Sequence, residues 1–104
     1  MKYILAIAMG FLLSATSPTL AGGGGAEWEK LSKEAKELYR TGKYDSGVVV
    51  AKKALELAEK NTRPNHPDVV TSLSVLAFIY DAQGKYAKAE PLYKRVLEIY
   101  EKAL

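Results

Sequence analysis

Side chains of the kinds that catalyse reactions or bind metals are few and lie far apart in the sequence. His66 is the only histidine and the chain has no cysteine. A zinc site needs three or four suitable ligands, and no second histidine or any cysteine can supply them. A cysteine nucleophile and a disulfide are excluded for the same reason. Asp45, Asp68 and Asp81 stand at predicted turns or helix ends, so no carboxylate pair is expected. The sequence therefore predicts no catalytic residue, no metal site and no cofactor.

His66 lies in a loop rich in turn residues, so we expect it to have a structural role. The loop leads into Pro67-Asp68, which is typical of a helix start. Proline at the first helical position has no amide hydrogen to leave unpaired, and an acidic residue in the first turn complements the helix dipole. The glycine run 22–25 is not a phosphate-binding loop, because the following lysine and the flanking strand of such a loop are missing.

The tyrosines have two possible interpretations. Aromatic residues are enriched in binding hot spots, which favours an exposed surface that binds a partner. Their spacing matches core and inter-helix positions instead, except at Tyr39, so we prefer a core role for most of them. Trp28 opens the first predicted helix and is expected to be a partly exposed cap. The tyrosines concerned are Tyr39, Tyr44, Tyr80, Tyr86, Tyr93 and Tyr100.

The first 21 residues have the pattern of a secretory signal peptide. Lys2 precedes an uncharged stretch from Tyr3 to Leu13, and small residues follow as far as Ala21. Those eleven residues would rise only about 16 Å as a helix, against the roughly 30 Å of a bilayer core, so an uncleaved anchor is the weaker alternative. We expect an exported chain with no membrane span after cleavage. The periplasm is its preferred location, and secretion is the alternative. Residues 22–26 would form a flexible glycine leader.

The charge of the chain argues against a nucleic-acid partner. The 104 residues carry 15 basic and 12 acidic side chains, a formal net charge of +3. The two signs alternate along the predicted helices, and bases adjoin only in pairs, as at Lys52-Lys53. Nucleic-acid binding needs a basic stripe or block, which this sequence lacks.

A repeat of 42 residues organises the rest of the chain. It superposes Gly42-Lys43-Tyr44 on Gly84-Lys85-Tyr86 and keeps apolar residues at helical spacing. Each half is predicted to be two antiparallel helices joined by a tight turn, with the glycine closing the first helix. The predicted helices are Ala26–Thr41, Tyr44–Asn61, Pro67–Gln83 and Tyr86–Ala103. Stacking one pair on the other would build a continuous core.

The two halves resemble tetratricopeptide repeats, in the 42-residue form found in kinesin light chains. The second half carries the closer match, from His66-Pro67-Asp68 through Gln83-Gly84-Lys85-Tyr86 to Ala89-Glu90-Pro91-Leu92-Tyr93. The resemblance implies an all-α fold of two stacked helix-turn-helix units, a fragment of a right-handed α-solenoid. It places the repeat domain at 27–104, with repeats at about 28–61 and 67–103. It also implies protein or peptide binding without chemistry.

Two residues depart from the usual helical preference. Gly47 stands where the repeat usually has alanine, and Val48-Val49-Val50 follows it. Glycine costs about 1 kcal/mol relative to alanine in a helix, so this helix should be the softest of the four. Pro91 falls early in the last helix, where a slight bend is expected but no break.

The resemblance implies a concave groove lined by the first helix of each repeat. The set expected on the first helix is basic on balance, with three basic side chains against one acidic, and the set on the third helix is partly apolar. Such a surface suits an acidic or C-terminal peptide with an apolar anchor. The expected groove residues are Glu29, Ser32, Lys33, Lys36, Tyr39, Arg40, Thr71, Ser74, Val75, Phe78 and Asp81.

Two functions remain open at this point. The first is an exported, non-catalytic module that binds a protein or peptide partner through the groove or the exposed repeat ends. The second is a structural unit that forms a homo-oligomer by stacking or swapping repeats, because two repeats are fewer than a stable stack usually has. Either would use an exposed C-terminal packing face of Leu92, Val96, Ile99 and Tyr100.

Overall fold

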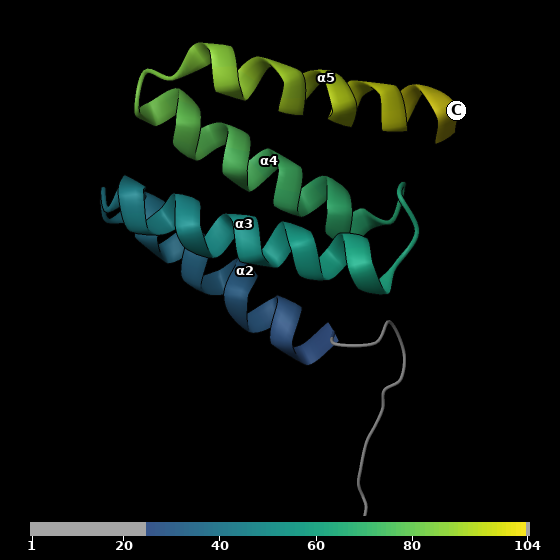
Figure 1. Cartoon of the computed structure of the whole chain (residues 1–104), viewed down its shortest axis with the longest axis horizontal. Coiled ribbons are helices and arrows are strands. Elements are labelled where there is room, and N and C mark those ends of the chain that lie inside the picture. The colour runs from purple at the N-terminus through teal and green to yellow at the C-terminus, as the bar shows by residue number, and fades with distance from the viewer. Residues whose placement is uncertain (1–24, 104) are drawn as a thin grey trace, which may run out of the picture.

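The computed structural model describes residues 25–103, which form four α-helices joined by short turns (Figure 1). No strand occurs between residues 25 and 103. Every helix bound lies within one residue of its predicted place, so the all-α fold of two helix-turn-helix units is confirmed. The helices are α2 (Gly25–Arg40), α3 (Tyr44–Asn61), α4 (Pro67–Ala82) and α5 (Tyr86–Ala103).

The predicted signal peptide lies outside the described residues, as does the predicted leader up to residue 24. The last two residues of that leader, Gly25 and Ala26, are already helical, because α2 begins at Gly25.

The turn within each unit is closed by glycine in the same way. Gly42 and Gly84 have φ of 79° and 78°, a region that residues with a side chain rarely adopt. After α2, the amide of Lys43 donates to the carbonyl of Leu38 at 2.8 Å, and that of Gly42 to Tyr39 at 3.1 Å. This pair of bonds satisfies carbonyls that the helix end leaves free. The same pair recurs after α4, so the 42-residue repeat reproduces one turn twice.

His66 caps the start of α4, and this is the structural role that was expected for it. Its ring Nδ1 accepts a hydrogen bond from the amide of Asp68 at 3.0 Å, and Pro67 follows at the first helical position. At the other end of the second unit, α5 continues through Pro91 without a break, as predicted.

Helix α4 is the most buried element because it packs between α3 and α5 and also contacts α2. Eight of its residues are buried, against one in α5. Many of the buried residues on the other helices are alanines, such as Ala35, Ala51 and Ala89, which let the helix axes approach closely. The core therefore lies along α4, between the two units.

The two units are closer on one side than on the other. The backbones of α2 and α4 approach each other, whereas those of α3 and α5 do not. Side chains span the second gap, where Arg95 Nη1 lies 2.7 Å from Glu59 Oε2. Since the first helices of the units are the nearer pair, the stack curves toward α2 and α4. That side is its concave face.

Gly47 lies where α3 comes close to side chains of α2 and α4. A Cβ atom built there would lie 3.1 Å from Ile79 Cδ1 and 3.5 Å from Leu38 Cβ. Glycine therefore admits the side chain of Ile79, which is fully buried. The glycine that weakens α3 locally thus lets α4 pack tightly against it.

Candidate functional site

Most of the residues predicted to line the groove lie at least partly at the surface, but two do not. Ser32 is 5% exposed and Val75 is 8% exposed, so the prediction that they line the groove is wrong. Trp28 shares a face of α2 with Ser32, and Ser72 shares a face of α4 with Val75. The indole nitrogen of Trp28 donates to Ser72 Oγ at 2.7 Å, so these two faces meet and cover each other.

The remaining groove residues are available to a partner. Thr71 and Ser74 are half-buried, and seven others are exposed. Val75 belongs to the core cluster with Ala35 and Ala51 and cannot anchor a peptide. The exposed groove residues are Glu29, Lys33, Lys36, Tyr39, Arg40, Phe78 and Asp81.

Aromatic rings from all four helices gather at the end of the stack where the two turns lie. The centroid of the Tyr39 ring is 6.1 Å from that of Tyr44 and 6.4 Å from that of Phe78, and Phe78 is 6.0 Å from Tyr93. Tyr86 shares one hollow with Phe78 and another with Tyr93. We call these five residues the aromatic surface. Phe78, at its centre, is 46% exposed, so a partner can reach it.

Two shallow hollows open on the aromatic surface, and both are lined by Asp81 and Tyr86. One, of about 310 Å³, is completed by Tyr39, Phe78 and Ala82. The other, of about 380 Å³, is completed by residues of α5: Ala89, Glu90, Tyr93, Lys94 and Leu97. Asp81 near the end of α4 therefore places a carboxylate between two aromatic hollows.

Asp81 and Tyr93 interact across the boundary between α4 and α5. The Tyr93 hydroxyl donates to Asp81 Oδ2 at 3.3 Å. Burial raises the pKa of the Tyr93 phenol, and the negative charge of Asp81 raises it further. The higher pKa extends toward more alkaline pH the range in which this phenol is neutral and donates.

Arg40, one of the expected basic groove residues, is already paired within its own helix. Its Nη2 lies 2.5 Å from Glu37 Oε2. The hydrogen bond and the charge of Arg40 lower the pKa of Glu37, and the same pair raises the pKa of Arg40. Lys33 and Lys36 are the predicted basic residues that keep exposed charge without an ion pair within residues 25–103.

The predicted C-terminal packing face is only partly exposed. Leu92, Val96 and Ile99 are half-buried, because they pack against the cluster formed by Ala58, Val69 and Leu73. Tyr100 is 56% exposed, and Leu97, which was not predicted, is 57% exposed. The most exposed apolar side of α5 is therefore the one that carries Leu97 and Tyr100, and we call it the open side of α5.

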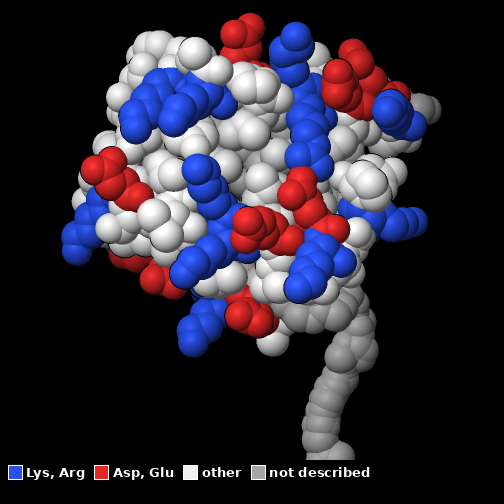
Figure 2. Space-filling model, viewed as in Figure 1, with Lys and Arg blue, Asp and Glu red and all other residues white. Residues whose placement is uncertain are grey.

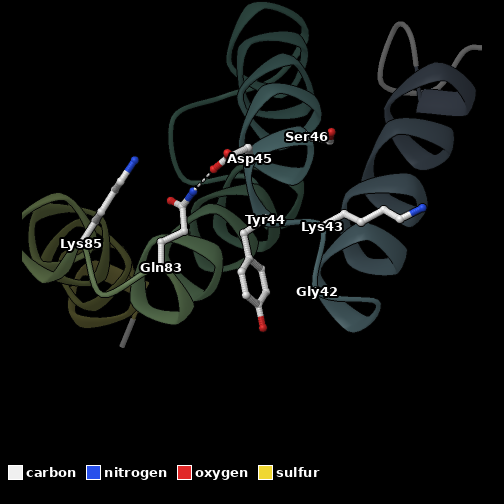
Figure 3. A pocket seen from close by; sticks show the side chains of 7 residues that line it. All are labelled: Gly42, Lys43, Tyr44, Asp45, Ser46, Gln83 and Lys85. Carbon is white, nitrogen blue, oxygen red and sulfur yellow. Dashed lines mark hydrogen bonds between the residues drawn. The ribbon is translucent and has the colours of Figure 1, made fainter.

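A third hollow, of about 450 Å³, lies between the two turns (Figure 3). Gln83 Nε2 donates to Asp45 Oδ1 at 2.7 Å and so joins the second unit to the start of α3. Figure 3 shows the side-chain nitrogens of Lys43 and Lys85 on opposite sides of this bond. Their charges do not converge on a common ligand position, so we assign the hollow a structural role.

Other kinds of site find no support in the part of the chain described. No group of three His, Cys, Asp or Glu side chains within residues 25–103 is arranged to hold a metal ion. No helix in that range combines the length and the apolar character needed to cross a bilayer. Figure 2 shows acidic and basic groups interspersed over the face in view, as the sequence pattern predicts.

The core interpretation of the tyrosines is right for some residues and wrong for others. Tyr80 is buried, and Tyr44 and Tyr93 are half-buried against the core. Tyr86, at 66% exposed, and Tyr100 lie at the surface. The sequence did not separate these cases, because Tyr86, Tyr93 and Tyr100 are spaced by seven residues and so share one side of α5, although Tyr93 alone among them packs against the core.

Comparison with known proteins agrees with this architecture. A family model described as tetratricopeptide repeat matches residues 33–102. No curated protein and no solved structure matches the chain. The relation to the 42-residue form of kinesin light chains stays a prediction. Tetratricopeptide repeats generally mediate protein–protein interaction and are typically non-catalytic scaffolds. With both helix pairs in place and a match over most of its length, the chain belongs to the tetratricopeptide repeat family.

Proposed function

We propose that this protein is an exported, non-catalytic module that holds a segment of another protein against the concave side of its helix stack. The aromatic surface, which includes Tyr39 of α2 and Phe78 of α4 among the predicted groove residues, is the observation that carries the proposal. Rings contributed by all four helices meet there, and Phe78 at the centre is nearly half exposed. Aromatic side chains with exposed faces next to shallow hollows are typical of binding hot spots.

The groove is tested by site-specific photocrosslinking in the native host. A photoreactive phenylalanine analogue replaces Phe78 on the aromatic surface or, as a matched control, Val49 on α3. Both positions carry exposed apolar side chains, at 46% and 55%, but only Phe78 is part of the aromatic surface. We expect a discrete crosslinked partner from position 78 and none from position 49. Equal crosslinking from both positions would contradict groove binding.

Export is part of the same proposal and rests on the first 21 residues. The basic Lys2, the short apolar stretch and the small residues up to Ala21 support a cleaved signal peptide. Cell fractionation followed by mass spectrometry of the mature N-terminus tests this. We expect the protein in the periplasm with its N-terminus near Gly22. An intact chain in the cytoplasm would contradict export.

Self-association is the second candidate function, and the open side of α5 favours it. Leu97 and Tyr100 are both more than half exposed on the last helix, and a second copy could cover them. Sedimentation analysis should then show a dimer that dissociates when Leu97 and Tyr100 are both replaced by glutamate. A monomer throughout the concentration range would exclude this function and leave groove binding unaffected.

A further inference from the structure

We propose that the two hollows beside Asp81 receive a basic side chain, preferably arginine, from the bound partner. The inference deepens the proposed function, on which it rests, by naming the chemistry of the residue recognised. It is carried by the placement of one carboxylate among four aromatic rings from three helices. Those rings belong to Tyr39, Phe78, Tyr86 and Tyr93.

The aromatic faces supply the first half of the recognition. A cation within about 6 Å of a ring centroid is attracted by the negative face of the ring, and arginine does this most often in proteins. The Phe78 ring stands 6.4 Å from Tyr39 and 6.0 Å from Tyr93, measured between centroids. A planar guanidinium group can stack on such rings while its methylene stem covers their apolar edges.

Asp81 supplies the second half, because it gives the hollows their charge. It lines both of them and forms no ion pair with any residue between 25 and 103. Its Oδ2 accepts one hydrogen bond, from Tyr93, which leaves the other carboxylate oxygen for a donor on the partner.

The other charges beside the hollows offset each other. Glu90 and Lys94 on α5 line the same hollow as Asp81 and lie one helical turn apart. The remaining negative charge on the lining residues of the two hollows comes from Asp81. A basic side chain therefore fits here better than the acidic peptide that the lysines of α2 led us to expect. It also fits better than a neutral aliphatic one, which would leave Asp81 unpaired.

The test uses the ¹⁵N-labelled purified protein and blocked pentapeptides with a central arginine, citrulline or glutamate between leucines. Citrulline keeps the planar shape of arginine but has no charge and carries a carbonyl oxygen in place of one NH2 group. We expect the arginine peptide to bind about tenfold more tightly than the citrulline peptide, with amide shifts centred on residues 78–97. Equal affinity of these two peptides, stronger binding of the glutamate peptide, or no binding of the arginine peptide would each overturn the inference.

Variants separate the two halves of the recognition. Asp81→Asn keeps the acceptor for Tyr93 and should remove most of the preference for arginine over citrulline. Glu56→Gln, on an exposed part of α3 outside both hollows, removes the same charge and should leave the preference unchanged. Phe78→Leu should weaken the arginine peptide about threefold, because it removes one aromatic face but keeps an apolar side chain. An unchanged preference in Asp81→Asn would refute the role of the carboxylate.

Choline separates a protein ligand from a small cation. It carries a quaternary ammonium that aromatic hollows can also bind. We expect it to bind more weakly than the arginine peptide, because its quaternary nitrogen has no N–H to donate to Asp81, whereas a guanidinium group has five. Binding as tight as that of the peptide would show a small-cation site and overturn the inference. Crosslinking from position 78 tests groove binding independently of the peptide measurements. Groove binding can therefore be correct even if the preference for arginine is not found.

Discussion

Replacing Ser72 by alanine should destabilise the stack by about 1 kcal/mol, because it leaves the indole N–H of Trp28 without a partner. The bond of 2.7 Å from Trp28 Nε1 to Ser72 Oγ joins α2 in the first unit to α4 in the second. The effect of this substitution measures how firmly the two units are held together, and hence how rigidly the concave face is presented.

The magnitude follows from the surroundings of the two groups. An unsatisfied buried donor costs about 1–3 kcal/mol. Ser72 is only 2% exposed, but Trp28 is half-buried, so water can partly replace the lost acceptor and the cost falls at the lower end. Alanine also favours the helix over serine by a few tenths of a kcal/mol. For a domain of this size, the net loss should lower Tm by about 4–8 °C.

The assay is urea unfolding followed by far-ultraviolet circular dichroism. Ser72→Ala is measured in the wild-type chain and in Trp28→Phe, where no indole N–H remains to be left unpaired. We expect a cost of about 1 kcal/mol in the first and nearly none in the second. Ser74→Ala, a half-buried serine on the same helix, is the matched control and should change little. Equal costs of Ser72→Ala in both backgrounds would refute the argument, because the bond would then contribute nothing measurable.

Three further predictions concern packing, capping and pH. Gly47→Ala should stabilise α3 by about 1 kcal/mol in the Ile79→Val background, where the methyl group 3.1 Å from the new Cβ is absent. In the wild-type chain the gain should be smaller. Urea unfolding measures both gains, and equal values would contradict the prediction. His66→Ala should cost about 1 kcal/mol by removing the cap of α4, whereas His66→Asn should restore most of it; thermal unfolding distinguishes the two, and equal losses would exclude a capping role. Because the pKa of Tyr93 is raised from 10.0 in the folded state, the folded chain keeps a proton that the unfolded chain releases as the pH rises above that value. The free energy of unfolding should therefore fall as the pH rises from the unfolded pKa of Tyr93 to its folded pKa, and this fall should be smaller in Tyr93→Phe. Identical dependence of the unfolding free energy on pH in the two proteins would contradict the raised pKa of Tyr93.

The helices could be predicted almost residue by residue because their signals are local. Gly42 and Gly84 adopt the positive φ that ends a helix, and Pro67 suits a first helical position. The role of His66 was predicted only in outline. Its ring nitrogen caps the helix in place of the usual hydroxyl or carboxylate, which residue type alone does not indicate.

The groove was predicted less well because burial depends on how the units stack. Ser32 and Val75 occupy positions that look open on a single helix pair, but each is covered by the other unit. Gly47 shows the converse case. In the sequence it is a weak helix former, and only the position of Ile79 explains why no side chain is present there.

The four helices, the two equivalent turns and the pairing of the helices into units follow from local signals in the sequence, because capping, glycine conformation and apolar periodicity act within a few residues. Tertiary structure decided which residues a partner can touch. Tyr39 and Phe78 are far apart in the chain, and their rings adjoin only because the second unit packs on the first at one particular angle. That angle is set by the joint packing of many side chains along α4, so the aromatic surface around Asp81 is a property of the stack rather than of any one helix.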